Sequence, residues 1–425
     1  MNCHHILPQL RRAEQEFSPH LAVIGVHAGK FRRERDTAAI VQAMRREEIG
    51  HPVVNDREMA IWHSYGVRAW PTLMLIDAQG RVVARQEGEL PYRELQERLK
   101  REIAGAAAAG DLAGGPPPVA ERIAAGRELR FPGGIVPAPD GTLYIADSGH
   151  HRIVAWRDGT GLVQAWGDGS PGLADGGPET CRLRDPHGLA LARDALFVAD
   201  SGNHALRRID LASGRMTTIN QRKGDAQEAP LGTAALRSPW DLAADATGVF
   251  VAAAGNHQVW RLEFDTGRLG PYAGSGYEAL YDADLARARL AQPMALVAAQ
   301  GSLFAADAES SAVRVMPQVP PGRVATLVGR GLFDFGSRQG AFGDTLLQHP
   351  QGLAFMDGDL YVADTYNDQV VRLDLAQRES SVVLAGLAEP GAIAAGRDGL
   401  YVLDTGRHRL LRWSPQATQA ELLLE

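Results

Sequence analysis

A sequence motif that is typical of an apolar strand, a polar turn and a second strand occurs six times in this sequence. The clearest copy, at residues 143–153, reads Leu-Tyr-Ile-Ala-Asp-Ser-Gly-His-His-Arg-Ile. The other copies begin at Leu196, Val249, Leu303, Leu360 and Leu400. A fixed period with short strands in each unit is typical of repeat proteins, because no unit can bury its apolar face alone.

The same lead-in precedes every copy, with a proline and, three residues before it, a leucine. The prolines stand at positions 132, 186, 239, 293, 350 and 390. Each unit offers four strand candidates, which in the first unit are residues 134–136, 143–146, 152–156 and 162–166. Six such units of about 50 residues predict a six-bladed β-propeller over residues 119–425. For ring closure, either residues 121–126 add a strand to the last blade, or the first and last blades pack together.

Residues 1–103 alternate instead between helical and strand patterns. Helices are expected at residues 3–16, 37–48, 58–65 and 92–103, and strands at 20–27, 52–54, 72–76 and 82–85. The run at 20–27 is apolar throughout, as in strands buried on both faces. This order predicts a small α/β domain, so the fold class is multidomain, α/β plus all-β. Residues 104–118, rich in Ala, Gly and Pro, predict a linker.

Composition excludes several classes of protein. Two cysteines in 425 residues exclude a disulfide framework. Residues 103–425 hold 28 Lys and Arg against 37 Asp and Glu, which argues against nucleic-acid binding. No apolar run approaches the roughly 18 residues that span a bilayer, so we expect no membrane association. Met1 leads into a polar segment rather than a signal peptide, which predicts a cytoplasmic protein.

Four histidines occupy the same place in four repeats, at positions 151, 204, 257 and 408. Equivalent positions in neighbouring blades lie too far apart for one zinc ion, whose ligand atoms must come within about 2.1 Å. We expect each histidine, with the aspartate of its repeat, to fasten a β-turn. The inner strands show no ring of carboxylates for calcium. The sequence therefore suggests no metal and no cofactor.

Two motifs carry a resemblance to known families. The lead-in Leu-x-x-Pro-x-Gly with the repeated strand pair resembles the NHL repeat. Trp70, Pro71 and Thr72 ahead of an apolar strand, and Pro8 five residues after Cys3, resemble the thioredoxin superfamily. The combination is similar to the NHL repeat-containing protein 2 family, a thioredoxin-like domain followed by an NHL propeller.

The resemblance implies a site in the first domain. The family's active-site loop ends in Asn-Cys, which Asn2 and Cys3 match, so Cys3 takes the resolving-cysteine position of a Cys-x-x-Cys pair. The first cysteine would lie one position before Met1, so we expect either a start upstream of Met1 or loss of the attacking thiol. The resemblance also implies a cis Pro71 in a loop, formed by Trp70, Pro71 and Thr72, that binds the substrate backbone.

Two functions therefore remain open. The first is a thiol–disulfide oxidoreductase whose propeller docks the substrate protein. The second is a non-catalytic interaction scaffold. The longest loops of the repeats, residues 167–182, 274–289 and 329–345, carry Tyr277, Tyr281, Phe333 and Phe335. These aromatic side chains either bind a partner protein or pack the loops onto the blades.

Overall fold

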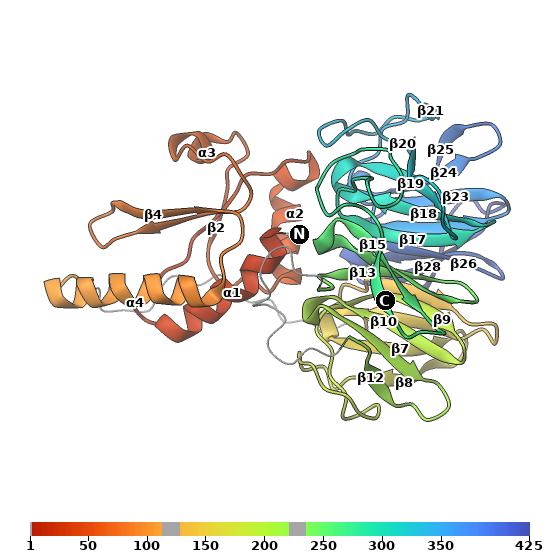
Figure 1. Cartoon of the computed structure of the whole chain (residues 1–425), viewed down its shortest axis with the longest axis horizontal. Coiled ribbons are helices and arrows are strands. Elements are labelled where there is room, and N and C mark those ends of the chain that lie inside the picture. Colours follow the sequence, from red (N-terminus) through yellow and green to blue (C-terminus); the bar gives the residue numbers. More distant parts are fainter. Residues whose placement is uncertain (1, 113–127, 221–234) are drawn as a thin grey trace. The chain divides into compact units, whose positions relative to one another are not determined.

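The computed structural model describes residues 2–112, 128–220 and 235–425, which form two compact units. The first unit is an α/β domain within residues 2–112, and the second is an all-β ring that begins after residue 127. Figure 1 shows the helices and short strands of the first unit in red and orange, and the sheets of the second from yellow to blue.

The α/β unit contains four α-helices, one 3₁₀ turn and four short strands among its described residues. They are α1 (Asn2–Phe17), β1 (Gly25–His27), η1 (Arg33–Arg35), α2 (Thr37–Arg46), β2 (Val53–Asn55), α3 (Ala60–Ser64), β3 (Thr72–Ile76), β4 (Val82–Glu87) and α4 (Tyr92–Ala109). Strands β1 and β2 pair in parallel, and β3 and β4 form an antiparallel hairpin. The core joins α1 and α4 to one face of β3, through Ile6, Leu95, Leu99, Leu73 and Leu75 among others.

Two predicted boundaries in this unit differ from the structure. The apolar run at 20–27 forms a strand only from Gly25, and Ile24 is 60% exposed, because the run pairs only with the short β2 and is not covered on both faces. Helix α4 continues past residue 103 to Ala109, since alanine is the strongest helix former. Gly110 then ends the helix with a φ of 76°. Residues 113–118 of the predicted linker lie outside the described residues.

The second unit contains the six predicted blades. Blade 1 holds β5 (Gly134–Pro137), β6 (Leu143–Asp147), β7 (Arg152–Arg157) and β8 (Gly161–Trp166). Blade 2 holds β9 (Pro186–Ala192), β10 (Ala195–Asp200), β11 (Ala205–Asp210) and β12 (Met216–Thr218). Blade 3 holds β13 (Pro239–Ala244), β14 (Gly248–Ala253), β15 (Gln258–Glu263) and β16 (Leu269–Ala273). Blade 4 holds β17 (Pro293–Ala299), β18 (Ser302–Asp307), β19 (Ala312–Pro317) and β20 (Ala325–Val328). Blade 5 holds β22 (Gly352–Met356), β23 (Asp359–Asp364), β24 (Gln369–Asp374) and β25 (Glu379–Ala385), with β21 (Gly340–Ala341) on its outer edge. Blade 6 holds β26 (Pro390–Gly396), β27 (Gly399–Asp404), β28 (Arg409–Trp413) and β29 (Glu421–Leu424).

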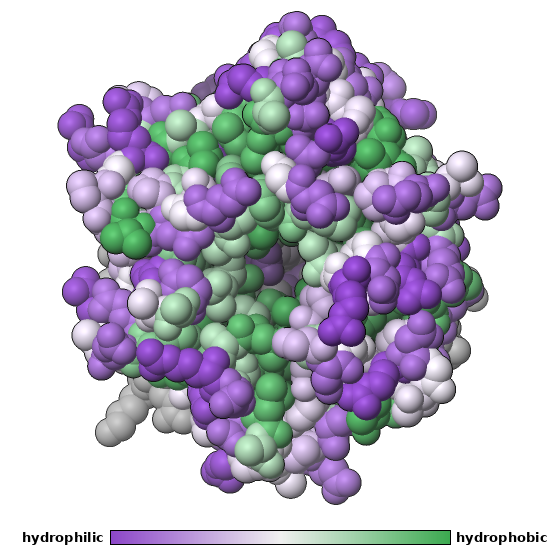
Figure 2. All heavy atoms as spheres, turned by 90° about the vertical axis from the view of Figure 1, so that its right-hand side faces the viewer, coloured by the Kyte–Doolittle hydropathy of each residue, from purple (hydrophilic) through white to green (hydrophobic). Residues whose placement is uncertain are grey.

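Blade 6 packs against blade 1. Each of six apolar clusters lies between two neighbouring blades, and the one that joins the last blade to the first contains Leu129, Ile135, Leu403 and Leu410. All four strands of blade 6 come from residues 390–424. The alternative closing strand at 121–126 lies outside the described residues. In Figure 2 the ring surrounds a hollow, with apolar residues around it and polar residues toward the rim.

The aspartate of each repeat anchors the lead-in of its own blade. Asp147 Oδ1 accepts a 2.7 Å hydrogen bond from Arg130 N, and Asp200, Asp307, Asp364 and Asp404 make the same contact with Arg184, Ala291, Gln348 and Ala388. All five carboxylates are fully buried. In blade 3, where Ala253 replaces the aspartate, Asn256 Oδ1 accepts from Arg237 N at 2.7 Å instead. Blade 3 therefore keeps the hydrogen bond to its lead-in although it lacks the aspartate of the other repeats.

The repeated histidines have a different role from the predicted one. His151, His204 and His408 each accept a hydrogen bond at Nδ1 from a backbone amide of the next blade, at 2.9–3.1 Å. The donors are Asp185, Ser238 and Phe131 respectively. The prediction that they fasten their own turns was wrong for these three, because each imidazole binds the backbone of the next blade.

Candidate functional site

Cys3 lies exposed in the first turn of α1. The helix buries Ile6 and Ala13 in the core of the α/β unit and contains Pro8, as the spacing from Cys3 suggested. Because α1 packs against β3, the strand that follows Pro71, the helix carrying Cys3 is held to the strand that begins at Thr72.

Two consecutive histidines in the first turn of α1 each pair with a glutamate from another segment. His4 Nδ1 lies 3.2 Å from Glu47 Oε2, just beyond the end of α2. Burial acts to raise the pKa of Glu47, but His4 and Arg46 outweigh it and hold that pKa well below its usual range. His5 Nδ1 lies only 2.6 Å from Glu89 Oε1, between β4 and α4. The side chains of His5 and Glu89 are 8% and 14% exposed, so the second pair is the more deeply buried one.

The loop formed by Trp70, Pro71 and Thr72, here called the Pro71 loop, leads into β3. The Trp70–Pro71 peptide bond is cis, as the resemblance implied. The ring of Trp70 lies tilted against that of Trp62 with 4.5 Å between ring centroids, and its Nε1 donates to Ala28 O at 2.8 Å. Thr72 Oγ1 donates to Ala69 O at 2.7 Å. The loop is thus fastened at both ends, while Trp70 remains 39% exposed.

The first turn of α1 and the Pro71 loop are joined through one short segment. Gly88 N donates a 2.8 Å hydrogen bond to Pro71 O. The next residue, Glu89, pairs with His5. Leu90 then packs in the same core cluster as Ile6. Residues 88–90 therefore contact both of the elements that the sequence picked out as a site.

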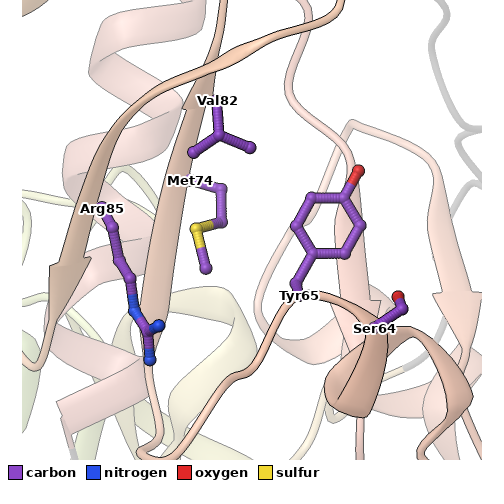
Figure 3. Close-up of a pocket in the computed structure, with 5 residues that line it drawn as sticks. All are labelled: Ser64, Tyr65, Met74, Val82 and Arg85. Carbon is purple, nitrogen blue, oxygen red and sulfur yellow. The ribbon is translucent and has the colours of Figure 1, made fainter.

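A separate pocket of about 480 Å³ lies in the same unit, lined by Ser64, Tyr65, Met74, Val82 and Arg85. In Figure 3, Tyr65 at the end of α3 lies across from Met74, Val82 and Arg85 of the β3–β4 hairpin. Met74 alternates with Leu73 and Leu75, which face α1 and α4, so the pocket is on the other face of the hairpin. It does not include Cys3 or the Pro71 loop.

The three long propeller loops, residues 167–182, 274–289 and 329–345, are here called the docking loops. Tyr277, Tyr281 and Phe333 are 69%, 53% and 72% exposed, whereas Phe335 is half-buried. The guanidinium of Arg289 lies 5.6 Å and 5.8 Å from the ring centroids of Tyr277 and Tyr281. Exposure therefore separates Phe335 from the other three aromatic side chains, each of which is more than half exposed.

Two of the docking loops are held by a buried arginine of the following blade. Arg207 is fully buried; its Nη1 donates to Asp200 Oδ2 at 2.7 Å and its Nη2 to Asp175 Oδ1 at 3.0 Å. Arg314 joins Asp307 and Asp282 in the same way, at 3.1 Å and 2.8 Å. The aspartate of the repeat and the arginine seven residues later form the sequence signal for this contact, which sequence reasoning missed.

Sequence reasoning also missed two residues of the inner strands. Asp241 stands where the other five repeats have glycine or alanine, and its Oδ2 accepts a 2.8 Å hydrogen bond from Leu296 N in blade 4. Burial raises the pKa of Asp241 to about 7. His187 of blade 2 stacks on Trp240 of blade 3, with 4.0 Å between ring centroids. Both contacts join the inner strands of neighbouring blades.

In the described parts of the chain, no three His, Cys, Asp or Glu side chains are grouped as metal ligands would be. Among residues 2–112, 128–220 and 235–425, no helix is both long and apolar enough to cross a bilayer.

Comparison with known proteins gives a family for each unit. Residues 1–82 match the thioredoxin-like family, and residues 129–156 and 347–373 match the NHL repeat. Protein SUPPRESSOR OF QUENCHING 1, chloroplastic, of Arabidopsis thaliana is 33% identical over 97% of this chain and 43% of its own length. NHL repeat-containing protein 2 of Bos taurus and of Homo sapiens are 32% and 31% identical, over 96% of this chain and 64% of their own lengths.

The chain thus spans between 43% and 64% of the length of these relatives. The matched residues cover strands and helices of both units. The α/β unit is a thioredoxin-like domain, the ring is an NHL propeller, and the chain is a homologue of NHL repeat-containing protein 2.

Proposed function

We propose that this protein takes part in thiol–disulfide exchange through Cys3, and that the propeller docks the protein that carries the disulfide. The Cys3 thiolate attacks one sulfur of the substrate disulfide, whose S–S bond breaks as a new S–S bond forms to Cys3. The second substrate sulfur leaves as a thiolate and takes up a proton. The product is a mixed disulfide and needs no further oxidant.

One observation carries this proposal. The exposed Cys3 lies in a helix turn that residues 88–90 join to the Pro71 loop, so a thiol and an exposed substrate-binding loop belong to one fastened structure. The other cysteine, Cys181, is fully buried in the propeller, and burial raises the pKa of its thiol. Cys3 is therefore the reactive thiol in this proposal. A low cysteine content fits a reducing compartment such as the cytoplasm, where Cys3 stays a thiol.

The test is formation of the mixed disulfide. The protein with Cys181→Ser is incubated at neutral pH with a short peptide that contains one disulfide, and mass spectrometry follows the adduct. We expect Cys3 to react about 10-fold faster than glutathione does with the same peptide, because a helix N-terminus favours the thiolate. The double variant Cys3→Ser/Cys181→Ser gives the background. A rate no higher than that of glutathione overturns the proposal.

Reduction of insulin by this chain alone should be slow. A dithiol cycle needs a second thiol to resolve the mixed disulfide, and Cys181 is buried in the other unit. With dithiothreitol as reductant, we expect turnover close to that of the Cys3→Ser variant. Fast turnover would show that an external thiol resolves the intermediate efficiently.

A second function, that of a non-catalytic scaffold, is favoured by the docking loops. Tyr277 and Tyr281 present exposed aromatic rings on the loop that Arg314 holds in place, and Phe333 presents one on the loop at 329–345. Such rings are typical of protein-binding surfaces. If Cys3 proves unreactive, the same loops would still bind a partner protein. Substituting the three rings by alanine should then abolish partner binding, whereas Cys3→Ser should not affect it.

A further inference from the structure

His5 is separated from Cys3 by one residue, and its side chain points into the protein rather than into solvent. Its Nδ1 lies 2.6 Å from Glu89 Oε1, within hydrogen-bond distance. Only 8% of the His5 side chain and 14% of the Glu89 side chain are exposed. A buried pair of this kind fixes geometry, because breaking it leaves a desolvated polar group behind.

The residues beside Glu89 continue this contact to the Pro71 loop. Gly88 N donates to Pro71 O at 2.8 Å, and Leu90 is 3% exposed in the cluster that contains Ile6. The path from the Cys3 turn to the substrate-binding loop is therefore short: His5, Glu89, Gly88, Pro71. At the His5–Glu89 contact, this path joins two residues that are 84 positions apart in the chain.

We propose that His5 and Glu89 are a positioning pair, which holds the turn carrying Cys3 against the Pro71 loop. A polypeptide disulfide that lies along this loop then meets the thiol in a defined geometry. The inference rests on the proposed function and adds to it the residues that align thiol and substrate. Neither side chain exchanges a bond with the substrate, so both are positioning residues and not catalytic ones.

The neighbouring pair, His4 with Glu47, supplies a matched control. It is formed by the adjacent residue of the same turn at 3.2 Å, but it contacts the end of α2 and not the Pro71 loop. Its side chains are more exposed, at 39% and 20%. A substitution at His4 therefore perturbs the same helix turn without touching the path through Glu89.

The test compares two disulfides in the Cys181→Ser protein. One is a short cyclic peptide that can lie on the Pro71 loop, and the other is the small aromatic disulfide DTNB, which needs no loop. In His5→Phe we expect the peptide reaction to fall about 10-fold and the DTNB reaction to change less than about 2-fold, since misplaced reactants lose rate steeply. Glu89→Gln should show the same split. His4→Phe should keep both rates within about 2-fold of the parent.

His5→Asn supplies the rescue, because its side-chain amide places a donor near the position of Nδ1. We expect it to recover most of the peptide rate. Equal losses with both reagents, or a peptide rate unchanged in His5→Phe, overturn the positioning pair while leaving the proposed function in place. If the parent itself does not react with the peptide, the proposed function fails. In that case, hydrogen exchange still tests the positioning pair. If backbone amides in the first turn of α1 exchange at the same rate in His5→Phe as in the parent, the positioning pair is overturned as well.

Discussion

The backbone amide of Phe131 donates a 2.9 Å hydrogen bond to Nδ1 of His408, 277 residues later in the chain. The phenyl ring of Phe131 also lies 4.2 Å from the imidazole, edge to face. The same donor–acceptor contact joins blade 1 to blade 2 and blade 2 to blade 3. The bond that closes the ring is thus a copy of the bond that joins consecutive blades.

His408→Ala should lower the free energy of unfolding of the propeller by about 1–3 kcal/mol, because a buried amide loses its acceptor. His151→Ala removes the equivalent bond between blades 1 and 2 and serves as the matched comparison. Thermal unfolding followed by the fluorescence of the buried propeller tryptophans measures both. An unchanged midpoint in His408→Ala would show that apolar packing alone closes the ring.

Asn256→Ala should destabilise the protein by about 1–2 kcal/mol more than Asn203→Ala does. Asn256 supplies the acceptor for Arg237 N, whereas in blade 2 the lead-in amide of Arg184 is bound by Asp200 and not by Asn203. The double variant Ala253→Asp/Asn256→Ala restores the aspartate of the other repeats and should recover part of the loss. Equal effects of the two asparagine substitutions in chemical unfolding would contradict this assignment.

Arg207→Leu should cost about 3–5 kcal/mol, the usual penalty for removing one partner of a buried ion pair. It leaves Asp200 buried without its cation and releases Asp175 in the docking loop at 167–182. We expect faster proteolysis within this loop as well as lower stability. Arg208→Leu is the control, because Arg208 is 38% exposed and pairs with Asp210 at the surface. Similar proteolysis of both variants would argue against the role of Arg207.

The stability of the propeller should depend on pH through Asp364. Burial raises the pKa of Asp364 to about 7, although Asn367, Gln348 and Gln369 donate hydrogen bonds that favour its charged form. The folded protein then holds a proton that the unfolded chain, with a pKa of about 3.9, has lost. The contribution of Asp364 to the free energy of unfolding therefore falls as pH rises from about 4 to about 7.

Asp364→Asn should remove this pH dependence. Thermal midpoints of the parent and the variant are measured across that range. The midpoint of the parent should exceed that of the variant by the largest margin at the acidic end. Burial also raises the pKa of Asp200, to about 6, so Asp200→Asn should show the same sign at lower pH. A parent advantage that grows toward alkaline pH would contradict the assignment of a raised pKa.

Much of the fold could be predicted because each blade repeats the same local pattern. The aspartate, the turn and the lead-in proline recur at nearly constant spacing, so the strand limits predicted for the first repeat agree with β5–β8 within one residue. The irregular parts were harder. The strand expected at residues 20–27 begins only at Gly25, since apolar composition does not reveal how many neighbours a strand has.

The candidate site was predicted only in part. Cys3, Trp70, Pro71 and Thr72 were chosen from motifs, but the segment that joins them was not. Glu89 lies in an unremarkable loop in the sequence, and its contact with His5 exists only because α1 packs beside the end of the hairpin. Asp241 carried a weak signal as an exception at its repeat position, whereas His187 stands at a position that varies between the repeats.

The amino-acid pattern alone established six sheets, their strands, and a separate α/β domain ahead of them, since strand periodicity and turn chemistry act over a few neighbouring residues. The folded ring decided which side chains meet. The curvature of the propeller turns His151, His204 and His408 toward the next blade and places His408 beside Phe131. Contacts between residues hundreds of positions apart depend on that curvature, which no local stretch of sequence encodes.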